Sequence, residues 1–201
     1  ILLNQAPHTL DLLYFMTGLM PKRVFSRCYF GKWHTIEVED DVTAFFEYEN
    51  GATASLVVST ADAPGTDRIE ILGDKGRVLL EGDKLKLSLL SVSEREYNAT
   101  FRGGFGAPQS RDCEVEVEKD AMQIHAAVFQ NMTNAILGKE DLFIDGKEGI
   151  YSCSMANAIL LSTWLGRWID MPFDDGLYYR ELKKRINGSV KKESGDSILN
   201  A

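Results

Sequence analysis

The stretch EDDVTAFFEYENGATASLVVS, residues 39–59, decides the fold of this chain. Both of its halves are rich in β-branched and aromatic residues, and the Asn50-Gly51 pair between them is a common hairpin turn. The stretch therefore predicts two antiparallel strands, Glu39–Tyr48 and Ala52–Ser59. Apolar side chains fall on both faces of these runs, so we expect a sheet that is covered on both sides.

Five further strands are expected around this hairpin, because short β-rich runs alternate with glycine-containing turns. Valine and glutamate alternate in the last of these runs, which predicts a strand with one wet face. The runs are Val24–Phe30, Arg68–Leu72, Arg77–Glu81, Lys84–Leu89 and Asp112–Glu118.

Three helices complete the pattern. Residues 4–17 form the first, with Asn4 as a candidate N-cap, Pro7 in the first turn and Gly18 after the end. Apolar stripes at helical spacing predict two more, over residues 122–136 and 151–168. The order of helix, strands and helices predicts an α+β fold: a large, mainly antiparallel open sheet with helices packed on one face.

Composition limits the class of protein. The 201 residues have 30 acidic and 22 basic side chains and 44% hydrophobic residues, as expected of one soluble domain. The net charge of -8 argues against nucleic acid, and the apolar runs are too short for a membrane span. The three isolated cysteines suggest neither a disulfide framework nor a zinc site, so a cytoplasmic location is expected. Residues 1–186 form the expected domain, and 187–201 a polar C-terminal tail.

Three polar side chains recur at helical spacing at the start of the chain. Asn4, His8 and Asp11 share one face of a helix, where they can meet a hydroxyl-bearing substrate. Histidine exchanges a proton near neutral pH, whereas Asn can only hydrogen-bond a hydroxyl. The alternative is structural: Asn4 only caps the helix, and His8 is a histidine with local partners.

The motifs of the chain stand in an order that resembles one family. The polar stripe is followed by Ile36–Thr43, Tyr48–Ala52, Ala63–Thr66, Arg68–Gly73, Gly76–Glu81, Asp145–Gly149 and Met171–Asp174. No single motif is specific, but the ordered set, which reaches about residue 185, resembles the C-terminal domain of the glucose-fructose oxidoreductase / inositol dehydrogenase / rhizopine-catabolism (Gfo/Idh/MocA) family. The resemblance implies a dihydrodipicolinate-reductase-like C-terminal domain, with the N-terminal Rossmann domain outside this chain.

That resemblance implies catalytic roles for His8 and Asn4. The family's histidine lies beside the substrate hydroxyl and shares the proton transfer with a lysine of the Rossmann domain. Asn4 stands where the family usually has Asp, so a two-residue Asp-His relay is in doubt. Asp11, one turn on, is expected to orient the His8 imidazole.

The resemblance also implies that one sheet face lines a sugar pocket. Candidate substrate contacts are Trp33, His34, Thr60, Arg68 and His125, since an aromatic ring packs on a sugar and Arg donates in a fixed fork. Each has a structural alternative: hairpin packing for Trp33, an ion pair with Glu49 or Glu70 for Arg68, and a core position for His125. The acidic run 37–41 is expected to be solvated or at an interface rather than to bind a metal.

The sequence therefore predicts the substrate-binding and oligomerisation domain of an oxidoreductase acting on a sugar, cyclitol or related polyol. NAD or NADP would be bound mainly by the domain outside this chain, so this fragment alone is expected to be inactive, without a cofactor or metal of its own. The expected partner besides the substrate is a second copy of the chain, paired through the sheet face. Two alternatives stay open: a catalytically inactive ligand-binding or regulatory protein of the same fold, and a self-contained α+β dimerisation domain.

Overall fold

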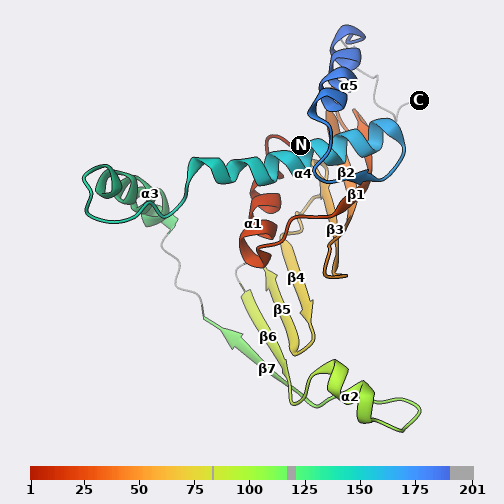
Figure 1. The fold of residues 1–201 in the computed structure, drawn as a ribbon, viewed down its shortest axis with the longest axis vertical. Helices are drawn as coiled ribbons and strands as arrows, with labels where there is room; N and C mark the ends of the chain where they lie inside the picture. Colours follow the sequence, from red (N-terminus) through yellow and green to blue (C-terminus); the bar gives the residue numbers. More distant parts are fainter. Residues whose placement is uncertain (83, 117–120, 191–201) are drawn as a thin grey trace. The chain divides into compact units, whose positions relative to one another are not determined.

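A computed structural model describes residues 1–82, 84–116 and 121–190, with the backbone alone at 121–124. It has an α+β fold with two antiparallel sheets of four strands, as Figure 1 shows. The α+β class is confirmed, but the strands form two sheets where the sequence predicted one. The chain divides into unit 1, residues 1–62 and 144–201, and unit 2, residues 63–143.

The sheet of unit 1 is built on the hairpin that the sequence predicted. Its strands, in the order β3-β2-β1-β8, are β1 (Arg23–Phe30), β2 (Glu39–Glu47), β3 (Thr53–Ser59) and β8 (Ile169–Asp170). Gly51, with φ of 83°, takes the left-handed conformation that the turn between β2 and β3 requires. The short strand β8 was missed by sequence reasoning.

Helix α4 (Gly149–Leu165) packs on β1 and is itself covered by α1 (Pro7–Thr17). Unit 1 also contains the short 3₁₀ helix η1 (Gly146–Glu148) and helix α5 (Asp175–Asn187). Helix α4 is apolar nearly all round because it has neighbours on two sides. The core combines side chains from α4, from the inner face of the sheet and from the start of the chain. Its largest apolar members are Leu2, Leu10, Val24, Val42, Phe46, Met155, Ile159 and Leu161.

Hydroxyl groups of α4 complete the hydrogen bonding of β1. Beyond its short pairing with β8, β1 has backbone N–H groups that lack a strand partner. The Ser26 N–H donates to Ser162 Oγ at 3.0 Å, and the Cys28 N–H donates to Thr163 Oγ1 at 2.9 Å. These bonds close an edge that would otherwise bury unpaired backbone groups.

Apolar side chains lie on both faces of this sheet, as the sequence predicted. Val42, Ala44 and Phe46 turn inward and are buried in the core. Phe45 and Val57 do point outward, with 40% and 73% of their surface exposed. Alternation along each strand accounts for this division.

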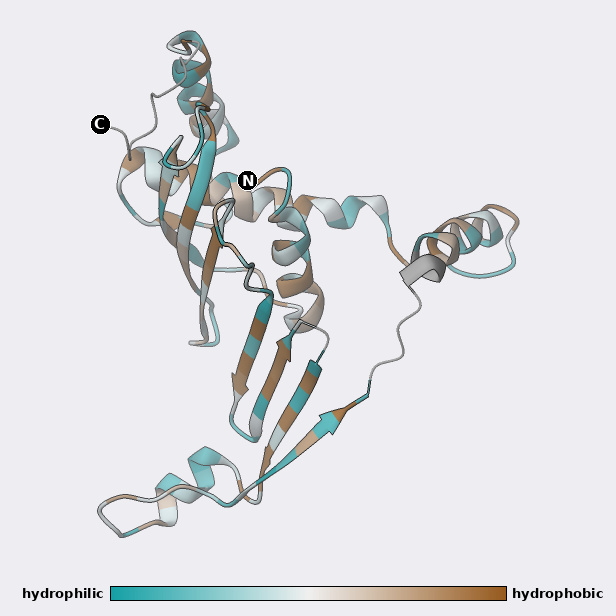
Figure 2. Ribbon diagram, turned by 180° about the vertical axis from the view of Figure 1, so that it is seen from behind, coloured by the Kyte–Doolittle hydropathy of each residue, from teal (hydrophilic) through white to brown (hydrophobic). Residues whose placement is uncertain are grey.

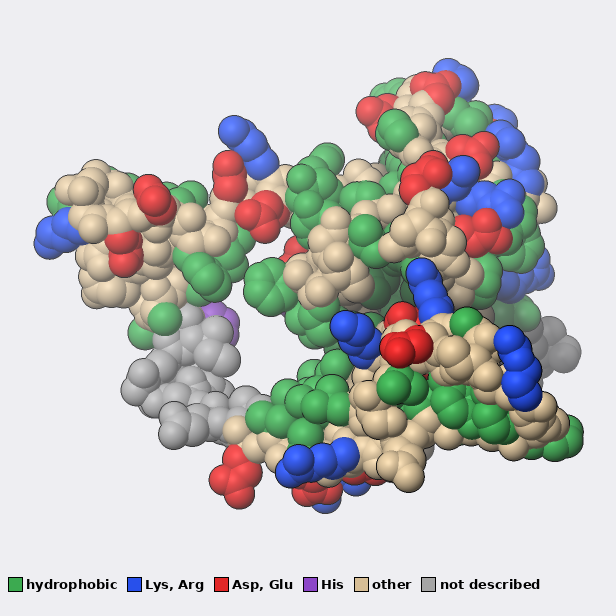
Figure 3. All heavy atoms as spheres, turned by 60° about the horizontal axis from the view of Figure 1, so that its bottom comes forward, with side chains coloured by type: hydrophobic (Ala, Val, Ile, Leu, Met, Phe, Trp, Pro, Cys, Tyr) green, Lys and Arg blue, Asp and Glu red, His purple; other side chains and the backbone are tan. Residues whose placement is uncertain are grey.

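Unit 2 contains β4 (Arg68–Gly73), β5 (Gly76–Glu81), β6 (Lys84–Leu90) and β7 (Ser110–Val115), with α2 (Glu94–Thr100) and α3 (Ala121–Ile136). Its strands alternate apolar and polar residues, visible as brown and teal bands in Figure 2. Apolar side chains stay partly exposed on this unit, as the green surface in Figure 3 shows. The stripe of α3, predicted to face a sheet, is also open: Phe129 is 73% exposed.

Several helix boundaries differ from the predicted ones. Helix α1 begins at Pro7 after Ala6, which has no side-chain cap bond, so Asn4 is not its N-cap. Trp168 lies beyond the end of α4, and its ring contacts Phe25 and Phe45 on the outer face of the sheet. Helices α2 and α5 were not predicted. Of the expected polar tail, residues 191–201 lie outside the described part of the chain.

No helix among the described residues combines the length and apolar character needed to cross a membrane.

Candidate functional site

The turn between β1 and β2 is organised around the buried carboxylate of Asp40. Three successive backbone N–H groups donate to it, those of Lys32 at 2.9 Å, Trp33 at 2.8 Å and His34 at 2.9 Å. Burial raises the pKa of the Asp40 carboxyl, but these donors outweigh burial and hold the pKa below its usual value. A charged acceptor at the centre of the turn therefore fixes the backbone that presents Trp33 and His34.

Asp41 holds the side chains of the same turn. Its carboxylate accepts from the Trp33 indole N–H at 3.0 Å and pairs with Lys32 Nζ at 2.9 Å. Burial raises the pKa of Asp41, and the Trp33 and Lys32 donors more than reverse this, so the pKa is lowered. The Trp33 ring is thus anchored at its polar edge while 41% of the residue stays exposed, an arrangement suited to packing on the C–H face of a sugar.

His34 is held by a residue of β2 and by the residue that follows β3. Its Nδ1 lies 3.4 Å from Asp40 Oδ2 and 3.1 Å from the hydroxyl of Thr60, the residue after β3. Thr60 also donates through its backbone N–H to the Asp40 carbonyl at 2.9 Å. The structure therefore brings together Trp33, His34 and Thr60, three of the predicted substrate contacts.

The segment that leads into α1 is bonded to the start of β2, next to this turn. Glu39, a buried residue, accepts the Leu2 N–H at 2.8 Å through its carboxylate. Its backbone carbonyl also accepts from the Ile1 nitrogen at 2.9 Å. The first residue of β2 thus fixes the entry to α1, where the polar stripe begins.

The stripe itself is on the surface. Asn4, His8 and Asp11 are all exposed. His8 and Asp11 lie on α1, but Asn4 lies in the turn before it, so only two of the three share the helix that the sequence predicted for them. Within the described residues, no hydrogen bond joins any two of the three, so Asp11 does not hold the His8 imidazole in this structure. The three side chains are open to a ligand, and their predicted roles stay predictions.

The two remaining candidates belong to unit 2. Arg68 on β4 pairs with Glu70 at 2.8 Å, one of the two ion pairs that the sequence offered as its structural alternative. It also pairs with Glu81 at 3.3 Å, which was not predicted. His125 is exposed on α3, so the core alternative for it is wrong. The β1–β2 turn belongs to unit 1.

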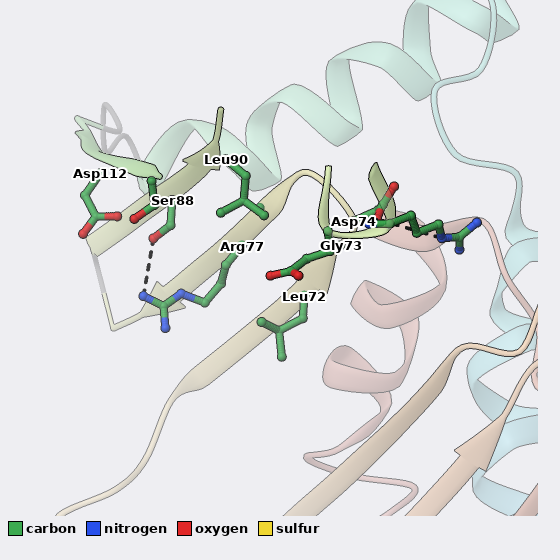
Figure 4. A pocket seen from close by; sticks show the side chains of 11 residues that line it. Leu72, Gly73, Asp74, Arg77, Ser88, Leu90 and Asp112 are labelled. Atoms are coloured by element: carbon green, nitrogen blue, oxygen red, sulfur yellow. Dashed lines mark hydrogen bonds and ion pairs between the residues drawn. The ribbon is translucent and has the colours of Figure 1, made fainter. Parts of the chain in front are cut away.

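A surface pocket of about 670 Å³ lies in unit 2, between the ends of the strands and α2. Figure 4 shows Arg77 reaching Ser88. The backbone N–H of Arg95 donates to Asp74 Oδ1 at 3.0 Å. Arg77 also pairs with Glu70 at 3.3 Å. None of the sequence-predicted residues lines this pocket, so we do not assign the substrate to it.

Sequence reasoning missed Asp40 and Asp41 as organisers of the site. The acidic run was expected to be solvated or at an interface, because alternating carboxylates usually are. The signal was the pair of adjacent carboxylates where a strand begins, directly after a short polar turn that supplies free backbone N–H groups.

Comparison with protein families gives one match: residues 1–79 fit the GFO/IDH/MocA C-terminal domain. This confirms the resemblance drawn from the motifs, and the matched range contains the α1 stripe and the β1–β2 turn. A comparison with curated protein sequences finds no match.

Solved structures share this fold. The WlbA dehydrogenase from Bordetella pertussis, in complex with NADH and UDP-GlcNAcA, has 26% identity and a TM-score of 0.61 over 85% of this chain and 44% of that one. UDP-N-acetylglucosamine 3-dehydrogenase GnnA from Acidithiobacillus ferrooxidans has 22% identity and a TM-score of 0.62, over 81% and 48%. An NAD-binding protein from Listeria innocua has 16% identity and a TM-score of 0.63, over 89% and 49%. The chain thus spans just under half the length of these proteins.

Proposed function

Because residues 1–79 match the GFO/IDH/MocA C-terminal domain, we propose that this chain is the substrate-binding domain of an NAD(P)-dependent sugar oxidoreductase. Its substrate is a sugar, cyclitol or related polyol. The relative WlbA, crystallised with NADH and UDP-GlcNAcA, favours a sugar or sugar nucleotide within that class. The Rossmann domain would be an N-terminal part of the same protein that lies outside these residues, and we expect the protein to be cytoplasmic.

One observation carries this proposal: Glu39, which directly follows the β1–β2 turn, accepts the Leu2 N–H at 2.8 Å. This bond ties the start of β2, next to the turn that presents Trp33 and His34, to the segment that leads through Asn4 into α1, which bears His8. His8 is suited to accept the proton of a substrate hydroxyl, and Trp33 to pack on the ring of the sugar. Asn4 hydrogen-bonds a hydroxyl and orients it.

The described residues do not fit a dinucleotide. Binding of its pyrophosphate needs a glycine-rich turn between a strand and a helix. The glycine-rich loop of this chain serves internal packing, because a Cβ at Gly103 would lie 2.3 Å from the Phe101 ring and one at Gly106 would lie 2.4 Å from the Tyr97 hydroxyl. The cofactor would therefore be bound by the other domain.

The isolated chain is expected to bind neither NADH nor NADPH at micromolar concentrations. Calorimetric titration of the purified chain with each nucleotide measures this directly. A dissociation constant in the micromolar range for either one would contradict the two-domain proposal. The positive control is the full-length protein, which is expected to bind one of the two.

The function itself is tested on the full-length protein. A panel of sugars, inositols and nucleotide sugars is screened for cofactor reduction, with a variant lacking the Trp33 ring, Trp33→Ala, as a comparison. We expect turnover of at least one compound and a raised KM in the variant. Binding of a sugar without turnover of any compound would favour the ligand-binding or regulatory alternative, which Asn4 in place of the usual Asp keeps open.

The outer face of the unit 1 sheet is the proposed site of self-association. Phe25, Phe45 and Val57 stay exposed there, beside Trp168. We expect the chain to form a homo-oligomer, most simply a dimer, because a monomer rarely exposes a large apolar patch.

Light scattering across a concentration series measures this association. Phe45→Lys is expected to lower the average mass towards the 22.5 kDa of one chain, and Tyr179→Lys, at an exposed aromatic on α5, is the matched control that leaves it unchanged. A wild-type chain that stays monomeric at high micromolar concentration would contradict the oligomer.

A further inference from the structure

The hydrogen bonds around His34 are compatible with one position of its ring proton. Nδ1 faces two oxygen atoms, the Asp40 carboxylate at 3.4 Å and the Thr60 hydroxyl at 3.1 Å. The side chain of Asp40 is completely buried, whereas 49% of the His34 side chain is exposed. One nitrogen of the ring therefore faces a fixed set of partners, and the ring is otherwise open.

Each of those partners limits where the proton can be. An ionised carboxylate only accepts hydrogen bonds, so Asp40 requires a donor at Nδ1. The Thr60 hydroxyl has a single proton, and the Asp40 carbonyl oxygen, an acceptor only, lies 3.2 Å from it. If Thr60 donates to that carbonyl, its remaining lone pairs accept from Nδ1. All contacts are satisfied together only when Nδ1 carries the proton.

We propose that Asp40 and Thr60 are positioning residues that hold His34 in its Nδ1–H tautomer and so present Nε2 to the substrate as a hydrogen-bond acceptor. A neutral imidazole that carries its proton on Nδ1 has a lone pair on Nε2. Such an acceptor selects a ligand hydroxyl, which can donate, over a carbonyl or phosphate oxygen, which cannot.

This inference rests on the proposed function for its ligand, but the tautomer is a property of the chain alone. The depressed pKa of Asp40 agrees with it, since the carboxylate stays ionised across the neutral range. The other charged groups near the turn have partners of their own. Lys32 and Asp41 are paired with one another at 2.9 Å, and the Glu37 carboxylate accepts the Val190 N–H at 2.7 Å.

Long-range ¹H–¹⁵N correlation spectra of the imidazoles test the tautomer, because protonated and unprotonated ring nitrogens differ strongly in ¹⁵N shift. The chain has only three histidines, and His34→Gln identifies the signals of His34. At about pH 8, the neutral imidazole of wild-type His34 is expected to be mainly Nδ1–H. His8 is exposed and serves as the internal control in every spectrum.

Two variants then remove the positioning groups one at a time. Thr60→Val keeps the shape of the side chain, and loss of one neutral hydrogen bond is expected to shift the tautomer ratio of His34 about five-fold towards Nε2–H. Asp40→Asn removes the charged acceptor and is expected to shift the ratio further. His8 signals are expected to stay unchanged in both. A wild-type His34 that is mainly Nε2–H, or a ratio that neither variant moves, would overturn the inference.

A titration with UDP-N-acetylglucosamine separates this inference from the proposed function. If the ligand shifts the His34 Nε2 resonance of the wild type but not that of Thr60→Val, both the inference and the proposed function are supported. A correct tautomer with no movement of any resonance contradicts the sugar-nucleotide ligand while the positioning of His34 stands. Movement of other resonances with His34 unaffected overturns the role of Nε2 in binding.

Discussion

Replacing His8 by alanine in the full-length protein is expected to lower kcat by about 10²- to 10⁴-fold, the usual contribution of a general acid or base. The proposed role is to take the proton of the substrate hydroxyl, and alanine has no group that can do so. Because His8 is exposed and makes no hydrogen bond within the described residues, its loss removes no packing. The melting temperature of the variant should therefore match that of the wild type.

Two neighbouring variants make this result specific. Gln5→Ala lies in the same exposed segment outside the polar stripe and is expected to leave kcat within about two-fold, since it removes no chemical group of the site. Asn4→Ala is expected to raise KM more than it lowers kcat, because it weakens the hold on a hydroxyl. Steady-state kinetics at saturating substrate measures all three. A His8→Ala enzyme with near-normal kcat would make His8 a surface residue without a catalytic role.

The strands were predictable from the sequence because alternation and turn residues are local signals. The hairpin of residues 39–59 forms as predicted, and the bounds of β4, β5 and β6 agree within one residue. The division into two sheets was not predictable, since alternation shows which residues share a face but not which strands pair. It falls between Ser59 and Arg68, where Ala63-Pro64-Gly65 interrupts the pattern.

The helices that the sequence did not predict, α2 and α5, have weak apolar faces. Helix α5 buries Glu181 alone among its residues, and this carboxylate is paired with Lys184 and with Arg185. Its best sequence signal was Asp174, which caps the helix by accepting the Gly176 N–H at 2.8 Å. The helix therefore depends on capping and charge pairs, which an apolar periodicity search does not detect.

The candidate site was predictable in its parts but not in its organisation. Trp33, His34 and Thr60 were chosen for their chemistry, and the structure joins them through hydrogen bonds. The joining residue, Asp40, escaped notice because its partners are backbone N–H groups, which every residue but proline has. Chemistry-bearing side chains are visible in a sequence, whereas acceptors for the backbone become visible only with the fold.

Asp40→Asn is expected to destabilise unit 1 by about 2–3 kcal/mol at pH 7, the range for hydrogen bonds to a charged group whose partners stay buried. The carboxylate accepts three backbone N–H groups, and an amide of the same shape replaces one of its oxygens with a second donor. All three tryptophans, Trp33, Trp164 and Trp168, lie in unit 1, so their fluorescence reports the unfolding of this unit in urea. Asp11→Asn, at an exposed carboxylate, is the matched control with no expected change.

The destabilisation caused by Asp40→Asn is expected to depend on pH. The pKa of Asp40 is lowered in the folded state, so its ionised form stabilises the fold above the ordinary carboxyl pKa of about 3.9, and that stability is lost as pH falls through the folded pKa. The difference in unfolding free energy between wild type and Asp40→Asn should therefore be largest at neutral pH. It should shrink as pH falls below about 3.9, where the unfolded chain takes up a proton at Asp40, and be lost below the lowered pKa of the folded state, where Asp40 is neutral like the amide. Other carboxyl groups titrate equally in both proteins and cancel in the difference. If the difference in unfolding free energy between the two proteins were the same at pH 7 and at pH 3, the Asp40 side chain would act through its shape, and its charge would not hold the turn.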